Sequence, residues 1–402
     1  MQNSELRIIL GAMKSTPITD METMADVQPL ESRRNYKILC QAEKASRLPT
    51  HPLSQILGTR NKNRLQRKSL NHLVRDAQKH LCLTQTQPEA LEARMWQNPS
   101  NAPTFRTDIP GLKSKGEHLP HDMLALTLEM IDHRYPPGTW THVYTDGSAD
   151  RAINNGGSGV YVKHTDGTAE SLHEPVGSLS TNYGAELHAL NMAAEHILSA
   201  GSSPQGTVFL TDSLSALQSL QEGPTDKMTT ELWKNLLKLS DKTKVTLQWI
   251  PAHTGIAGNE IADSLAKAGS RLPQPPSSLS YREAKTILKQ TAYKDWPREG
   301  YDFKTDGLHS LGRKAQTTVF RLRTGHCRLN KHMRRMSLSD SASCPCGAQD
   351  QTPIHVLQTC PLFEEARTST WEEDTPFHTK LWGSSTDLMR TANFASTTGL
   401  KF

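Results

Sequence analysis

The sequence has few cysteines and no long apolar run. Six cysteines in 402 residues are too few for a disulfide framework, so we expect a reducing, intracellular compartment, nuclear or cytoplasmic. No segment approaches the roughly 18 consecutive apolar residues of a membrane span. The first residues, Met1 to Glu5, lack the basic and then apolar pattern of a signal peptide. These absences argue against membrane and secretory classes.

Charge is distributed unevenly along the chain. The length of 402 residues favours two or three domains. Residues 1–137 hold 19 basic and 14 acidic residues, residues 138–271 hold 9 and 14, and residues 272–402 hold 18 and 13. An acidic block therefore lies between two basic blocks, which indicates a separate role for its carboxylates.

Proline-rich segments separate these blocks. Tyr135-Pro136-Pro137-Gly138 precedes the acidic block, and a proline- and serine-rich segment, residues 272–278, follows it. We therefore predict a basic helical region over residues 1–84, a linker over 85–137, a globular domain over 138–271 and a basic region over 272–402.

Within residues 138–271, patterns typical of strands and helices alternate. Strands are predicted at residues 142–145, 159–162, 169–176, 207–210 and 245–250, and helices at 183–198, 214–220, 232–239 and 259–268. Three strands followed by a helix, a strand, two helices, a strand and a helix predict an α/β fold, a mixed sheet with helices packed on it.

Four acidic residues fall where such a sheet forms ligand sites. Asp146 and Asp212 each follow a predicted strand, and Glu186 and Asp263 lie near the starts of predicted helices. Taken singly, each has an ordinary explanation as a turn former, a helix-start acid or a surface charge. Clustered carboxylates repel one another unless a cation neutralises them, and hard oxygen ligands suit Mg²⁺ or Mn²⁺. As a set, they predict a divalent-metal site.

The four acids belong to a longer set of motifs. The motifs are Asp146-Gly147-Ser148, Asn182-x-x-Ala185-Glu186-Leu187, Thr211-Asp212-Ser213 and His253-x-Gly255-x-x-Gly258-Asn259-Glu260-x-Ala262-Asp263. With these motifs, nearly all of residues 140–270 resembles the type 1 ribonuclease H family. The resemblance implies a ribonuclease H-like five-stranded mixed sheet in the order 3-2-1-4-5, and hydrolysis of the RNA strand of an RNA–DNA hybrid by two metal ions.

The resemblance also implies roles for single residues. Asp146 would bridge the two Mg²⁺ or Mn²⁺ ions, Glu186 and Asp212 would hold one ion, and Asp263 would complete the other. His253, on a glycine-containing loop, would act as a proton shuttle, which suits a group that titrates near neutral pH.

Substrate contacts are implied at two further places. Asn182 and the backbone around Gly147 and Ser148 would contact RNA 2′-hydroxyl groups, which distinguish RNA from DNA. Thr181 would bind a phosphate of the DNA strand. For Thr181 and Asn182, helix capping is the alternative, and both roles are compatible.

The last basic block contains a second set of metal-ligand residue types. Cys344-x-Cys346-x₈-His355-x₄-Cys360 offers three sulfurs and one imidazole, a set compatible with tetrahedral zinc. Scattered reduced cysteines are the alternative.

Two segments of the chain are strongly basic. Residues 313–335 contain eight basic residues and no acid, and residues 60–79 contain seven basic residues and one acid. Such runs favour contact with a nucleic-acid backbone, with a solvated helix face as the alternative.

Both flanks resemble parts of non-LTR retrotransposon (LINE, jockey-like) polyproteins. Residues 322–330 together with the Cys/His motif resemble the segment after the ribonuclease H domain, and residues 7–17 and 29–34 resemble the region just after the reverse transcriptase core. The aromatic-x-Asp-Asp motif of the polymerase is absent from the sequence.

We therefore predict a hybrid-specific ribonuclease from a retrotransposon-derived protein. The alternative is a catalytically inactive, nucleic-acid-binding remnant. An integrase or resolvase of the same superfamily would carry a different last motif. Nothing in the sequence indicates an oligomeric state.

Overall fold

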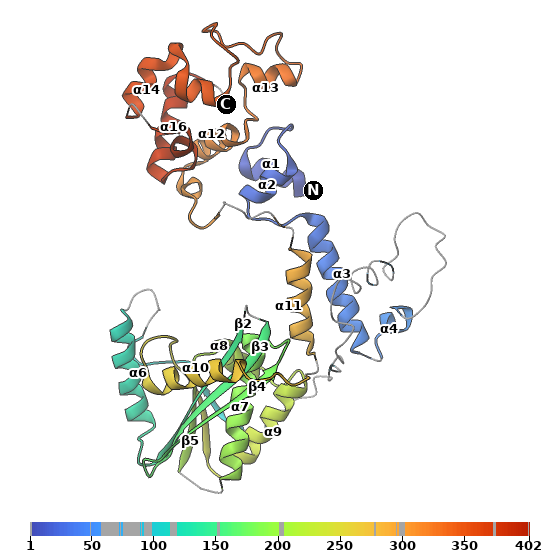
Figure 1. Cartoon of the computed structure of the whole chain (residues 1–402), viewed down its shortest axis with the longest axis vertical. Helices are drawn as coiled ribbons and strands as arrows, with labels where there is room; N and C mark the ends of the chain where they lie inside the picture. The colour runs from blue at the N-terminus through green and yellow to red at the C-terminus, as the bar shows by residue number, and fades with distance from the viewer. Residues whose placement is uncertain are drawn as a thin grey trace. The chain divides into compact units, whose positions relative to one another are not determined.

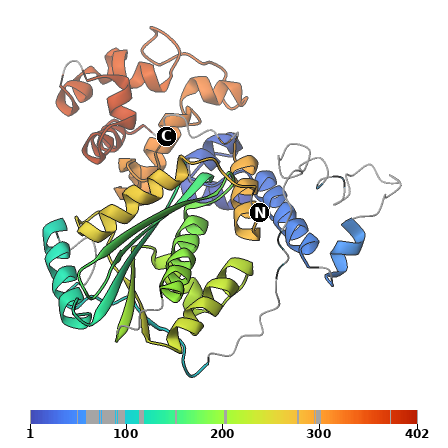
Figure 2. The same ribbon diagram turned by 60° about the horizontal axis from the view of Figure 1, so that its bottom comes forward.

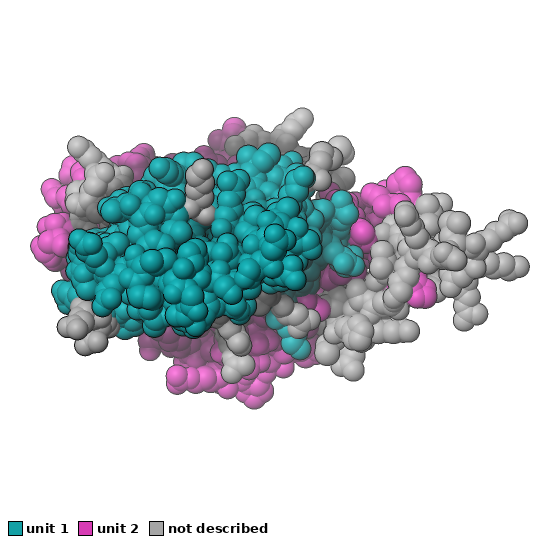
Figure 3. Space-filling model, turned by 90° about the horizontal axis from the view of Figure 1, so that it is seen from above, with its two compact units in different colours: residues 1–35, 292–402 teal, residues 36–291 magenta. Residues whose placement is uncertain are grey.

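A computed structural model describes residues 2–48, 50–57, 72, 74, 89, 91, 99–112, 119–150, 153–200, 205–276, 279–294, 296, 302–372, 375–400 and 402. The chain divides into two compact units (Figure 3): residues 36–291 form one, and residues 1–35 together with 292–402 form the other. None of the helices in the described ranges combines the length and apolar character needed to cross a bilayer. The seven basic residues of segment 60–79, which were predicted to contact a nucleic-acid backbone, lie outside the described residues.

A six-stranded mixed sheet is the centre of unit 36–291. Its strands are β1 (Thr104–Arg106), β2 (Trp140–Asp150), β3 (Asn154–Lys163), β4 (Ala169–Gly177), β5 (Gly206–Thr211) and β6 (Lys244–Trp249). The spatial order is β1-β6-β5-β2-β3-β4, with β3 antiparallel to both β2 and β4 and the other pairs parallel. Strands β2 to β6 thus have the predicted order 3-2-1-4-5, and the ribonuclease H-like fold class is confirmed.

The burial of the strands follows their place in the sheet. All six residues of β5, Gly-Thr-Val-Phe-Leu-Thr, are buried, as expected for a central parallel strand covered on both faces. In contrast, β4 at the edge is largely exposed and contains Pro175, which has no N–H to donate.

Helices α7 (Asn182–Ser199) and α10 (Ala257–Ser270) cover opposite faces of the sheet (Figures 1 and 2). The helices of this unit are α6 (Pro120–Arg134), α7 (Asn182–Ser199), α8 (Leu214–Gln221), α9 (Lys227–Ser240) and α10 (Ala257–Ser270). A β-carbon on Gly147 would overlap the backbone of α7, and one on Gly157 would overlap the backbone of α10. Gly147 pairs with Ser158, the neighbour of Gly157, so the two glycines face opposite sides. Their missing side chains allow both helices to pack closely.

The segment predicted as a linker, residues 85–137, contains two elements of this unit. Strand β1 pairs with β6, so the sheet has one strand more than expected. Helix α6 contributes Met130 and Ile131 to the same core as Phe209 and Leu190. A three-residue strand is too short to show an alternating pattern, and it is held by its neighbour in the sheet.

Segments on both sides of the predicted domain also join this unit. They include residues 36–46 of α3 (Leu30–Ser46), α4 (Pro52–Leu57) and most of α11 (Tyr281–Ala292). The buried Arg47 joins them: its guanidinium donates to the Glu43 carboxylate at 2.7 Å, to the Leu279 carbonyl at 2.5 Å and to the Glu89 carbonyl at 3.1 Å. The chain after residue 271 therefore returns to the sheet domain.

The other unit is helical and combines both ends of the chain. Its elements are α1 (Gln2–Leu10), α2 (Ile18–Met24), η2 (Gly307–Ser310), α12 (Arg313–Thr324), α13 (Asn330–Arg335), η3 (His355–Thr359), η4 (Pro361–Phe363), α14 (Glu364–Thr370), α15 (Phe377–Trp382) and α16 (Ser385–Thr397). Leu6 and Met21 share a buried cluster with Phe320 and Leu388. Helical flanks were expected, but their packing into one unit was not.

Candidate active site

Two of the predicted acids lie side by side at one end of the sheet. The parallel pairing of β2 with β5 ends at Thr145 and Thr211, and Asp146 and Asp212 are the next residues along the chain. Strand β2 itself continues to Asp150 along β3, so Asp146 lies within the strand rather than at its end. The register of the sheet therefore determines that these two carboxylates are neighbours.

The third acid, Glu186, reaches the same point from helix α7. It is the fifth residue of that helix, where α7 packs on Gly147 of β2. Asp146, Glu186 and Asp212 each offer a carboxylate oxygen, and the three atoms lie within 4.8 Å of one another. The side chains of Asp146 and Glu186 are buried, and Glu186 Oε2 has no hydrogen-bond partner among the described residues. An unpaired buried oxygen beside two other carboxylates fits a divalent cation.

The electrostatics of the three acids support this fit. Burial, followed by the charges of Asp212 and Asp263, raises the pKa of Asp146 to about 8. Burial also raises the pKa of Glu186 well above its usual range, with further contributions from Asp146 and Asp212. A hydrogen bond from the Gly147 backbone lowers the pKa of Glu186 in part. Without a cation, the ionised forms repel one another, and a bound cation would remove that repulsion.

The fourth acid, Asp263, lies outside this group of three. It is the seventh residue of α10, and its Oδ2 accepts a hydrogen bond at 2.6 Å from Lys267 Nζ, one turn later. Its charge still contributes to the raised pKa of Asp146. The predicted helix began at residue 259, two residues after the observed start of α10, so Asp263 was expected closer to the helix start than it is. The helix dipole acts mainly within the first turn, so it explains the position of neither Asp263 nor Glu186.

His253 lies in the turn between β6 and α10 and is exposed. Its φ of 54° is in the left-handed region, which is uncommon for a residue with a β-carbon. Gly255 follows with φ 86°, and the Thr254 hydroxyl donates to the Pro251 carbonyl at 3.1 Å. The turn thus presents the imidazole to solvent.

Two residues beside the acids were not predicted as functional. Asn259 of α10 donates from Nδ2 to Asp212 Oδ2 at 3.3 Å, and so connects this helix to the end of β5. Lys267 pairs with Asp263 and lowers the pKa of Asp146. The spacing contained a signal for both, because residues 259, 263 and 267 are four apart and therefore share one helix face.

The predicted substrate-contact residues lie at the start of α7 and in β2 next to Asp146. Thr181 is the N-cap of α7, and its hydroxyl accepts a hydrogen bond from the Gly184 N–H at 3.0 Å. Asn182 is the first residue of the helix and is exposed. Gly147 and Ser148 follow Asp146 in β2. The capping role of Thr181 is therefore observed.

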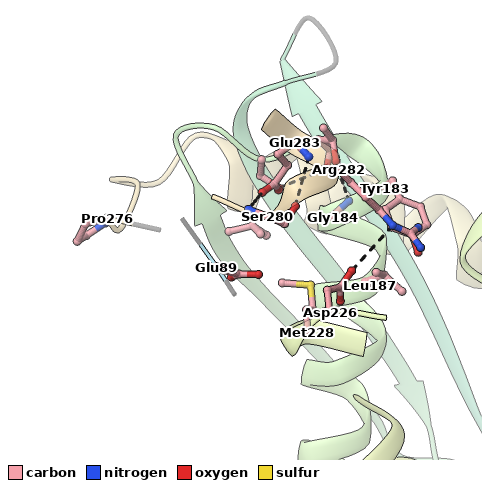
Figure 4. A pocket seen from close by; sticks show the side chains of 13 residues that line it. Glu89, Tyr183, Gly184, Leu187, Asp226, Met228, Pro276, Ser280, Arg282 and Glu283 are labelled. Carbon is pink, nitrogen blue, oxygen red and sulfur yellow. Dashed lines mark hydrogen bonds and ion pairs between the residues drawn. The ribbon is translucent and has the colours of Figure 1, made fainter. Parts of the chain in front are cut away.

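A cavity of about 250 Å³ lies at the amino end of α7, and Figure 4 shows its lining. Arg282 of α11 contacts the Tyr183 ring at 4.6 Å and donates to Ser219 Oγ at 3.0 Å. Burial raises the pKa of Glu283, whose carboxylate accepts from the Ser280 N–H at 2.9 Å. None of the three clustered acids is among the described residues that line this cavity, so it is separate from the candidate metal site.

Residues of the second predicted metal set also converge. Cys344, Cys346, His355 and Cys360 each offer one ligand atom, and these four atoms lie within 4.8 Å of one another in the helical unit. The sequence predicted both the members and the grouping of this set.

Part of the chain is similar to known proteins. Residues 139–271 match the family model for RNase H. A solved structure of RNase H1 from the halophilic archaeon Halobacterium salinarum NRC-1 is 21% identical, with a TM-score of 0.27, and the match covers 32% of this chain and 96% of that one. The N-terminal RNase H domain of Rv2228c from Mycobacterium tuberculosis, solved as a fusion with maltose-binding protein, is 19% identical, with a TM-score of 0.28 and coverage of 33% and 94%. The family match covers residues 139–271, about a third of the chain.

Proposed function

We propose that the protein is an endoribonuclease that hydrolyses the RNA strand of RNA–DNA hybrids. The observation that carries this proposal is the meeting of Asp146, Glu186 and Asp212 within 4.8 Å, in a domain that matches RNase H. The buried, unpaired Oε2 of Glu186 supports a cation at this point.

The same residues would hold the metal. Asp146, Glu186 and Asp212, with Asp263 alongside, would bind two Mg²⁺ or Mn²⁺ ions. When bound, such ions activate a water molecule and stabilise the leaving 3′-oxygen.

Two other side chains form hydrogen bonds with these acids. Lys267 Nζ keeps the Asp263 carboxylate paired, and the Asn259 amide orients Asp212. His253 would deliver a proton to the leaving oxygen.

Residues at the start of α7 and in β2 next to Asp146 would bind the substrate. Asn182, Gly147 and Ser148 would contact RNA 2′-hydroxyl groups, and Thr181 would contact a DNA phosphate while it caps α7.

A hybrid-cleavage assay tests the proposal. The purified protein should cleave a labelled RNA strand paired with DNA when Mg²⁺ is present, and should leave single-stranded RNA intact. Asp146→Asn should reduce cleavage by at least about a hundredfold, as expected when a group that stabilises the transition state is lost. The matched control is Asp150→Asn, because Asp150 is exposed on the same strand.

The outcomes separate the candidate functions. Unchanged cleavage by Asp146→Asn would contradict the assigned site. Binding of the hybrid without cleavage in Mg²⁺ or Mn²⁺ would favour the inactive nucleic-acid-binding remnant.

We also propose that basic segment 313–335 contacts the nucleic-acid backbone through only some of its cations. Arg323 forms a buried ion pair with Asp306 at 2.6 Å, and Arg321 donates to the carbonyls of Gly11 and Phe402 at 2.7 Å. Arg313 donates to the carbonyls of Ile8 and Ile9. These three arginines hold the fold of the helical unit. Lys331 pairs with Asp350 at 3.4 Å, and Arg335 Nη2 lies 3.0 Å from His332 Nδ1. The exposed cations Lys314, Arg328 and Arg334 are therefore the better candidates for phosphate contact.

The origin of the chain is part of the same proposal. Motifs at residues 7–17, 29–34 and 322–330 resemble non-LTR retrotransposon polyproteins, and residues 1–35 pack with 292–402. A protein derived from such an element would carry the RNase H domain between a region of the kind that follows the reverse transcriptase core and a segment of the kind that follows the RNase H domain.

A further inference from the structure

A site of different chemistry lies in the helical unit, where no carboxylate is involved. Cys344 Sγ is 3.6 Å from Cys360 Sγ, and Cys346 Sγ is 3.2 Å from His355 Nε2. All three cysteines are free thiols. Bonds of about 2.3 Å from zinc to sulfur and about 2.0–2.1 Å to nitrogen give tetrahedral ligand separations of roughly 3.5–3.8 Å. The two separations given above are close to those of ligands around one zinc ion.

Local hydrogen bonds orient these side chains. The Cys344 and Gly347 backbones form a tight turn, in which the Gly347 N–H donates to the Cys344 carbonyl at 2.9 Å and Gly347 has φ 80°. The Ala348 N–H donates to Cys346 Sγ at 3.4 Å. His355 Nδ1 lies 3.0 Å from Thr359 Oγ1, which directs Nε2 toward Cys346. A partner on the second ring nitrogen is typical of a metal-bound histidine.

The surrounding chain has little regular structure to hold it. Residues 336–352, all described, form turns, bends and one isolated bridge between Ser343 and Asp350. Next to them, Cys327, Leu329, Val356 and Leu357 belong to a small buried cluster. Segments with few helices or strands commonly depend on a metal or a disulfide for their fold.

We propose that Cys344, Cys346, His355 and Cys360 bind one zinc ion in a closed, structural site. Three thiolates and one imidazole are the soft and borderline ligands that zinc prefers, and four protein ligands leave no position for a substrate. The ion would join the turn at residues 344–347 to the segment 355–360, and so hold the loop against the buried cluster. This proposal is independent of the ribonuclease activity, which depends on the carboxylates of the other unit.

Metal analysis of the purified full-length chain tests this proposal. The wild-type protein, expressed with zinc in the medium, should contain one zinc per chain. Cys346→Ser should reduce that content at least about tenfold. Cys40→Ser is the matched control and should keep the full content, since Cys40 is a buried cysteine of α3 outside the cluster.

A spectroscopic measurement keeps the test valid if Cys346→Ser misfolds. Cobalt added to the metal-free wild-type protein should give thiolate-to-cobalt charge-transfer absorption and intense tetrahedral visible bands, which saturate at one equivalent and disappear when zinc is added. A wild-type protein that contains no zinc and gives no such cobalt spectrum would overturn the proposal. So would a Cys346→Ser variant that keeps its zinc.

Discussion

Burial of like charges is the dominant property of the acidic cluster at the scale of single residues. Asp146 and Glu186 are buried beside Asp212, and the pKa values of both are raised. A raised pKa means that the ionised carboxylate is unfavourable in the folded protein. As the pH rises, the same group therefore ionises at a lower pH in the unfolded chain than in the folded protein. Stability then falls as the pH rises from the ordinary pKa of 3.8 toward the folded value of about 8.

Removal of one of these charges should therefore stabilise the metal-free protein. We expect Asp146→Asn to raise the melting temperature in EDTA at pH 7–8 by at least about 2 °C, because the amide removes the repulsion and needs no proton. Mg²⁺ should stabilise the wild-type protein and have little effect on the variant. Thermal melts between pH 5 and 8, with Asp150→Asn as the control, measure both effects. A variant less stable than the wild type in EDTA at every pH would contradict this explanation.

Gly147 determines how close α7 comes to the sheet. A β-carbon at this position would overlap the backbone of Ala185 and Glu186. We expect Gly147→Ala to displace Glu186 from the other acids and to lower hybrid cleavage by about a hundredfold, since small misplacements of catalytic groups have effects of this size.

Gly138→Ala provides the control for this prediction, because a β-carbon at Gly138 would meet no atom within 4 Å. Circular dichroism should show that both variants keep their helices and strands. Cleavage by Gly147→Ala within about twofold of the wild type would show that the helix tolerates the side chain.

At the scale of elements, the sheet domain is larger than the segment that resembles RNase H. Ile109, Met130, Ile131 and Tyr135 precede residue 139, and all four are buried in the main core. The Tyr135 hydroxyl donates to Gln248 Oε1 at 2.9 Å, and His142 Nε2 lies 2.6 Å from the Tyr135 carbonyl. Residues 104–135 therefore complete the domain.

A comparison of two fragments tests this extension. Burial of one large apolar side chain contributes about 1.5–3 kcal/mol, and a fragment of residues 138–271 lacks four of them. We expect it to unfold at a clearly lower urea concentration than a fragment of residues 99–294, which keeps β1, α6 and α11. Urea titrations followed by circular dichroism measure the two midpoints. Equal midpoints would mean that the preceding elements only rest on the domain.

The same elements show what a sequence pattern can predict. Strands β2 to β6 and helix α7 were predicted because alternating or helical apolar spacing extends over enough residues to be recognised. Strand β1 has three residues, and its position depends on pairing with β6, about 140 residues away. The clustered acids were predicted from motif order, whereas the Asn259 contact with Asp212 depends on how α10 packs on the sheet. Contacts between distant segments are not encoded in local spacing.

At the scale of the whole molecule, the net charge of +5 is the sum of an acidic domain and basic flanks. Within segment 313–335, three cations contribute to folding: Arg323 through its buried pair with Asp306, and Arg321 and Arg313 through their contacts with backbone carbonyls. The number of basic residues in a segment therefore overestimates the number available to a nucleic acid, and the contacts within the fold distinguish the two kinds.

The remaining exposed cations should determine the salt dependence of hybrid binding. Each phosphate contact contributes about −0.9 to the slope of log K against log salt for a DNA duplex. If Lys314, Arg328 and Arg334 each contact one phosphate, their triple replacement by alanine should reduce the magnitude of the slope by up to about 3.

The matched control replaces Lys227, Lys234 and Lys238 of α9, three exposed lysines of the acidic domain. Fluorescence anisotropy with a labelled hybrid, in the Asp146→Asn background to prevent cleavage, gives affinities over a range of salt concentrations. A smaller slope in the flank variant alone is the expected result, because those side chains are exposed and, among the described residues, have no ion-pair partner of the kind that Arg323 has. Equal slopes for the two triple variants would place the binding energy elsewhere in the chain.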